Sequence, residues 1–174
     1  MLIRKLIEVD AKQFWALRLR GLREEPQAFG ASYEEELNTP IDNLISRFNS
    51  EIILPSEENF IVGAFNENDD MVGVVGFRRG TRIKLKHKSN IWGMYVVPEF
   101  RQMGIGKLLL SELLNSAKNR DGLEQINLEI VSSNFSAMRL YDSFGFKTYG
   151  VEKNALKIGE EYFDDELMML FINK

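Results

Sequence analysis

The order of predicted elements indicates a mixed α/β protein, α+β in some schemes, with helices packed on the faces of one sheet. Apolar residues recur at helical spacing in some segments, such as 104–118, and alternate or run together as in strands in others, such as 71–77. The resulting order is one strand, two helices, three strands, a helix, a strand, a helix and two strands. No internal repeat or linker divides the 174 residues, so we expect a single domain over 1–174.

The N-terminal part is predicted to contain one strand and two helices. The strand covers Leu2–Leu6, and the first helix follows Asp10, which is suited to capping a helix start. Pro26 ends this helix. An acidic loop at Glu34–Glu36 then leads to a second helix, which starts at Thr39-Pro40.

The middle of the chain is predicted to form three strands, at 60–65, 71–77 and 91–97. A polar turn at 66–70 joins the first two strands, and a basic link at 78–88 joins the second to the third. Ile83 and Leu85 alternate with basic residues in this link, which favours an extended, strand-like conformation.

The C-terminal part is predicted to alternate helices and strands. A helix at Gly104–Lys118 is followed by a strand at Gln125–Val131 and a helix at Asn134–Phe144. Within 125–131, Ile126, Leu128 and Ile130 share one face, and Glu129 and Val131 lie on the other. Two last strands follow, near Lys147–Leu156 and Tyr162–Ile172.

Composition excludes several classes of function. The net charge of −4 argues against nucleic acid as the main partner. The chain has no cysteine and one histidine, His87, so a thiol nucleophile is excluded and no metal site is predicted. No apolar stretch resembles a signal peptide or approaches the ~20 residues of a membrane span, which predicts a cytoplasmic protein without a membrane partner.

The segment Arg101–Lys107 has the features of an anion site, because it lies between a predicted strand and the start of a helix. Helix N-termini carry unpaired amides and partial positive charge, and glycines let a phosphate approach the backbone. A Walker A loop would need glycine at Arg101 and Ser or Thr at Leu108. A dinucleotide fingerprint starting at Gly104 would need glycine at Leu109. Both alternatives fail, and R-x-x-G-x-G remains.

A second motif follows this segment, in which a strand leads to Asn134, Ala137 and Tyr141 and then to Gly145-Phe146. Together the two motifs resemble the GNAT superfamily of N-acetyltransferases over Ile91–Phe146, and more loosely over the N-terminal helices. The resemblance implies a mixed, mostly antiparallel sheet of about seven strands with helices on both faces. It also implies acetyl-CoA as acyl donor, bound in a V-shaped gap between the strands at 91–97 and 125–131.

The resemblance assigns specific contacts to the donor. Backbone of the strand at 91–97 would face pantetheine and the acetyl carbonyl, the glycine-containing segment would bind the diphosphate, Asn134 would contact the pantetheine arm and Tyr141 would approach the sulfur. The predicted cofactor residues are Tyr95, Val96, Val97, Arg101, Gln102, Met103, Gly104, Ile105, Gly106, Lys107, Asn134 and Tyr141.

The chemistry of acetyl transfer requires a base and an acid. An alkylamine with a pKa near ~10 must lose a proton before it can attack, and the leaving thiolate benefits from a proton donor. Glu129 is the predicted base and Tyr141 the predicted acid. Structural roles are the alternatives: Tyr141 as a core residue, Glu129 on a solvent face and Asn134 as a helix cap.

The acceptor is predicted only as a class, a primary amine on a small molecule or a protein N-terminus, and the lack of cysteine favours direct transfer. Candidate acceptor-binding residues are Phe29, Tyr33, Glu34 and Trp92. The acidic residues of the last hairpin could also attract a cationic acceptor, namely Glu160, Glu161, Asp164 and Asp165. The basic link at 78–88 has two possible roles. It either contacts the 3′-phosphate of CoA or an acidic partner, or it is only a solvated connection. GNAT proteins frequently dimerise, so the resemblance allows a homodimer. The alternative functions are a non-catalytic acyl-CoA-binding regulatory module and an interaction domain without cofactor.

Overall fold

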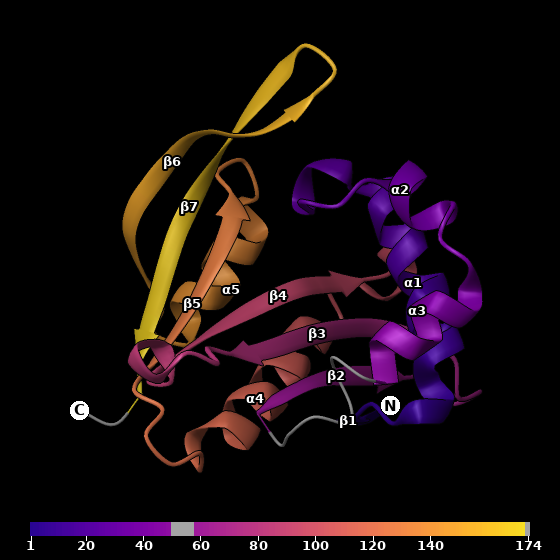
Figure 1. Ribbon diagram of the computed structural model, residues 1–174, viewed down its shortest axis with the longest axis horizontal. Coiled ribbons are helices and arrows are strands. Elements are labelled where there is room, and N and C mark those ends of the chain that lie inside the picture. Colours follow the sequence, from indigo (N-terminus) through magenta and orange to yellow (C-terminus); the bar gives the residue numbers. More distant parts are fainter. Residues whose placement is uncertain (50–57, 173–174) are drawn as a thin grey trace.

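The computed structural model describes residues 1–49 and 58–172, and its centre is one seven-stranded sheet (Figure 1). The strand order is β1-β2-β3-β4-β5-β7-β6, and only β4 and β5 pair in parallel. The strands are β1 Leu2–Lys5, β2 Asn59–Phe65, β3 Met71–Arg79, β4 Lys88–Val96, β5 Gln125–Val131, β6 Lys147–Ile158 and β7 Glu161–Phe171. The α-helices are α1 Ala11–Glu24, α2 Tyr33–Leu37, α3 Ile41–Arg47, α4 Ile105–Lys118 and α5 Phe135–Ser143. Short 3₁₀ helices are η1 Glu8–Asp10, η2 Pro26–Ala28, η4 Ile83–Leu85 and η5 Pro98–Phe100.

The core lies between the sheet and the helices, as the apolar spacing predicts. The spacing-four stripe of α4 is buried along its whole length, at Ile105, Leu109, Leu113 and Ala117. Strands β2 and β3 are buried on both sides, because α4 and α1 both contact this part of the sheet. The predicted mixed sheet, mostly antiparallel and with helices on both faces, is therefore confirmed. Within the described residues, no helix is long and apolar enough to cross a membrane.

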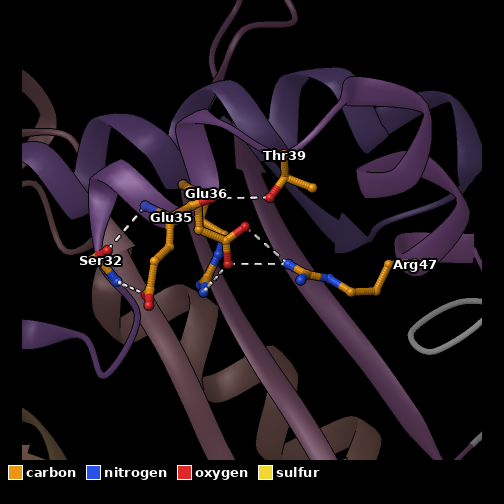
Figure 2. A network of polar contacts seen from close by, with 6 residues as sticks. Ser32, Glu35, Glu36, Thr39 and Arg47 are labelled. Atoms are coloured by element: carbon orange, nitrogen blue, oxygen red, sulfur yellow. Dashed lines mark hydrogen bonds and ion pairs between the residues drawn. The ribbon is translucent and has the colours of Figure 1, made fainter.

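The acidic segment Glu34–Glu36 is helical, and the predicted loop there is wrong. Ser32 caps α2, since its hydroxyl accepts a hydrogen bond from the Glu35 amide at 3.1 Å and its own amide donates to the Glu35 carboxylate at 3.2 Å. Figure 2 shows these reciprocal bonds. A Ser followed by Glu three residues later is the capping-box pattern, which satisfies amides that a helix start otherwise leaves unpaired.

The basic link between β3 and β4 is also not extended as predicted. Residues Ile83–Leu85 form a 3₁₀ turn with exposed apolar side chains. Arg79 holds the link in place, because its guanidinium donates to the carbonyls of Lys86 and Asp121, each at 2.6 Å. The solvated-connection alternative fits this local structure.

Candidate active site

A cleft opens where β4 and β5 separate. The two strands pair only over Lys88–Asn90 and Gln125–Asn127, and Figure 1 shows them diverging beyond this point. A cavity of about 580 Å³ lies between the diverging segments and is lined by Ile91–Met94 on one side and Leu128–Val131 on the other. The predicted V-shaped gap is confirmed at these residues.

A bulge in β4 shapes the floor of this cleft. Val74 pairs with Tyr95 and Gly76 pairs with Trp92, so two residues of β4, Gly93 and Met94, lie opposite one residue of β3. Gly93 has φ +61°, a conformation that favours glycine. A bulge takes backbone groups out of the ladder and re-aims the side chains beside it. Backbone polar groups of β4 are thus available at the point where the cleft begins.

The start of α4 has the geometry of an anion site. Gly104 is the N-cap residue with φ +78°, and none of the described residues caps the helix with its side chain. The first amides of a helix have no intrahelical acceptor, so those of Ile105, Gly106 and Lys107 remain open to a ligand. Gln102 also has a positive φ, of 63°, which turns the chain sharply into the helix. The predicted segment therefore forms an uncapped helix start rather than a tightly capped one.

Met94 connects this helix start to Tyr141. A Cβ on Gly106 would lie 3.3 Å from the Met94 methyl carbon and 3.2 Å from Leu140, so α4, the bulge and α5 meet closely here. The Tyr141 hydroxyl donates to the Met94 sulfur at 3.1 Å. Burial raises the pKa of Tyr141, which therefore keeps its proton at neutral pH. The Tyr141 hydroxyl, a possible proton donor, thus lies near the start of α4.

Five of the predicted site residues line the cavity: Phe29, Trp92, Glu129, Asn134 and Tyr141. Glu129 is exposed toward it, on the face of β5 opposite the buried Leu128. The side chain of Asn134 accepts a hydrogen bond from the Ala137 amide at 3.1 Å, so it caps α5 and lines the cleft as well. Tyr33 and Glu34 belong to α2 and are not among the lining residues.

The remaining predicted cofactor residues are not among the lining residues; they lie at the end of β4, in the connection that follows it and in the first turn of α4. The Tyr95 side chain is buried and donates to the Glu24 carboxylate at 2.5 Å, so its hydroxyl belongs to the contact with α1. Arg101 donates to the Val96 carbonyl at 3.0 Å and to Glu25 at 2.9 Å. Arg101 therefore links the helix start to the end of α1.

Four further charged residues line the cavity, and they lie on different walls. Our sequence analysis named Asp165 and the basic link that begins at Arg78, but it did not point to Arg18 or Glu152. Arg18 comes from α1 and Arg78 from β3, whereas Glu152 and Asp165 come from β6 and β7. Asp165 pairs in register with Val131 and with Glu152. Burial, and after it the nearby Glu129 and Glu152, raise the pKa of Asp165. The acidity near the last hairpin was a sequence signal for Asp165, but Arg18 gave none, because a basic residue on a surface helix is common.

Comparison with known proteins agrees with this geometry. The family model described as an acetyltransferase (GNAT) domain matches residues 3–168. A [ribosomal protein bS18]-alanine N-acetyltransferase of Salmonella typhimurium is 29% identical over 86 residues, which are 49% of this chain and 57% of that protein. The chain thus spans about half the length of the named relatives it matches.

Solved structures resemble the whole described fold. A GNAT-family acetyltransferase from Streptococcus pneumoniae superposes with a TM-score of 0.85 at 22% identity, covering 99% of each chain. The structure of yncA from Salmonella typhimurium with its cofactor acetyl-CoA gives a TM-score of 0.84 at 19% identity, covering 100% of this chain and 95% of that one. The family model, the seven-stranded mixed sheet and the split between β4 and β5 agree, and the chain belongs to the GNAT acetyltransferase family.

Proposed function

We propose that the protein is an acetyl-CoA-dependent N-acetyltransferase that acetylates a primary amine by direct transfer. One observation carries the proposal: the uncapped start of α4 and the Tyr141 hydroxyl meet at Met94, at the edge of the cleft between β4 and β5. An anion site, a proton donor and an open cleft are the three features that a phosphorylated thioester and an incoming amine require. We further infer that residues 1–174 act as one domain, since one sheet runs through it.

The residues of the chain have distinct roles in this proposal. The amides of Ile105, Gly106 and Lys107 bind the diphosphate, and the backbone of Tyr95–Val97 follows the pantetheine arm. Bound acetyl-CoA supplies the thioester, whose C–S bond is exchanged for a C–N bond to the amine. Glu129 accepts the proton that the amine loses, and Tyr141 donates a proton to the leaving sulfur. Solvent then returns the proton to Tyr141, so the products are an acetamide and CoA with its free thiol.

The burial of the two side chains supports this division of labour. Tyr141 is buried, and within residues 1–49 and 58–172 the one hydrogen-bond partner of its hydroxyl is the Met94 sulfur, a weak acceptor. A stronger acceptor at the same place can therefore replace Met94. Glu129 is exposed, so it can exchange its proton with solvent between turnovers. In each cycle the buried acid delivers one proton to the leaving sulfur, and the exposed base removes one proton from the amine.

Calorimetric titration with acetyl-CoA tests the donor, and an assay of thiol release with a panel of amines tests the reaction. The panel contains free amino acids, a polyamine, an aminoglycoside and a short peptide with a free N-terminus. Binding together with amine-dependent thiol release supports the enzyme. Binding without thiol release for any amine would instead favour the regulatory module, and no binding at millimolar acetyl-CoA would refute the donor site.

A further inference from the structure

Three residues that line the cavity each have one buried polar atom that no hydrogen bond satisfies within the described part of the chain. These atoms are Nε of Arg18, Nε1 of Trp92 and Oδ1 of Asp165. Buried polar groups are nearly always paired, and unpaired ones mark a missing ligand or water. Two of these atoms are donors and one is an acceptor. The cleft is therefore built to hold a molecule with both an acceptor group and a donor group.

The two kinds of atom lie on different elements. Arg18 and Trp92 belong to α1 and β4, whereas Asp165 belongs to β7, beside Glu152 of β6 and near Glu129 of β5. Across the cavity the charge thus changes from a guanidinium to a group of carboxylates. A polyamine would place a cation against Arg18, and a dicarboxylate would place an anion against Asp165, so neither complements both walls.

Arg18 is fixed in place rather than free in solvent. Its side chain is 15% exposed, and its Nη2 donates to Glu36 at 3.3 Å. Glu36 is itself buried and accepts two further bonds from Arg47, at 3.1 and 3.2 Å, as Figure 2 shows. One carboxylate therefore serves two guanidinium groups, which leaves a net positive charge at this wall. Because Arg47 keeps Glu36 paired, Arg18 can bind a second anion.

The bulge brings β4 next to the guanidinium of Arg18. A Cβ on Gly93 would lie 3.8 Å from Nη1 of Arg18, an ordinary contact distance, so at residue 93 no side chain covers this nitrogen. Gly93 is next to Met94, the partner of Tyr141. An anionic group bound at Arg18 thus lies in the same cleft as the proposed proton donor.

We infer that the acceptor is an amine that also carries an anionic group, an amino acid or a close analogue, whose anion binds Arg18 and the Trp92 indole while its amine faces Glu129 and Asp165. This inference rests on the proposed function and specifies its substrate. Arg18 is then a specificity-determining residue, and Glu36 is the positioning residue that holds it. The indole adds a neutral donor to the charged one, which suits a carboxylate with two acceptor oxygens.

The test compares amino acids with their own amides, in which a neutral carboxamide of nearly the same size replaces the carboxylate. Glycine, β-alanine and γ-aminobutyrate sample three distances between amine and anion, and each is assayed with acetyl-CoA beside its amide. We expect kcat/KM for at least one acid to exceed that of its amide by roughly 10- to 100-fold, the value of one charge-assisted hydrogen bond. Amides that match their acids throughout would overturn the inference while leaving the proposed function intact.

Arg18→Gln should lower the ratio of kcat/KM for the acid to kcat/KM for its amide to about one. Arg18→Lys should keep part of this preference for the acid. Arg23→Gln, an exposed arginine on the same helix outside the cavity, is the matched control and should keep the full ratio. A full ratio in Arg18→Gln would refute the role of Arg18. If this variant fails to fold, the comparison of acids with amides in the natural protein still decides. If the natural protein does not bind acetyl-CoA, the proposed function itself is refuted.

Discussion

Replacement of Tyr141 by phenylalanine should separate catalysis from structure at this site. The ring is buried and packs edge-to-face on Phe146 with centroids 5.5 Å apart, a contact that phenylalanine keeps. The hydroxyl loses only its bond to the Met94 sulfur, so we expect the free energy of unfolding to fall by less than ~1 kcal/mol. Loss of a positioned proton donor should lower kcat by about 10²-fold, which corresponds to about 2.7 kcal/mol of activation free energy.

The assay is thiol release at saturating acetyl-CoA, with calorimetry to show that acetyl-CoA affinity changes by less than about threefold, below ~1 kcal/mol. Tyr149→Phe, an exposed tyrosine on β6, is the matched control and should retain full kcat. A kcat for Tyr141→Phe close to that of the control would refute the assignment.

Because burial raises the pKa of Tyr141, the folded protein retains this proton above pH ~10, the pH at which a tyrosine in the unfolded chain ionises. Activity should therefore not fall through loss of this proton up to about pH 10. The same shift affects stability. A pKa that is higher in the folded than in the unfolded protein stabilises the fold at pH values below the unfolded pKa, and this contribution is lost as the pH rises further. Tyr141→Phe should accordingly weaken the decline of stability at strongly alkaline pH.

Three further substitutions test other parts of the site. Gly104→Val forces a β-branched residue into φ +78°, so acetyl-CoA affinity measured by calorimetry should fall about tenfold or more, with Gly104→Ala falling less; unchanged affinity would place the diphosphate elsewhere. Glu129→Gln should lower kcat by about 10²-fold and flatten the pH–rate profile, and an unaltered profile would assign the base to another group or to water. Asp165→Asn removes a carboxylate whose pKa is raised and which is charged at neutral pH. The melting temperature at pH 7 should therefore rise by about 2 °C, and this gain should disappear as the pH falls to about 4. A lower melting temperature of the variant at pH 7 would contradict the direction of the pKa shift.

Much of the fold follows from local sequence patterns. The apolar stripe of α4, the alternation in β5 and the glycines and prolines between elements predict helices and strands that the structure contains. The predicted boundaries agree with the observed ones to within a few residues. The loop predicted at 34–36 is wrong because the pairing of Ser32 with Glu35 starts a short helix. In that segment, a local capping interaction outweighs the loop that acidic composition suggests.

Local patterns along the chain were enough to predict the family, a helix start suited to a diphosphate, and two candidate catalytic residues at a fixed spacing. Each of these depends on neighbours within one element or one turn. Only the tertiary structure brought Arg18 of α1 and Asp165 of β7 into one cavity, since they are far apart in the chain and meet only where β4 and β5 diverge. Met94 acquired its place between Gly106 and Tyr141 in the same way. A local motif predicts the donor, whereas the surface that we propose for the acceptor has no local signature, because it is assembled from α1, β3, β4, β5, β6 and β7.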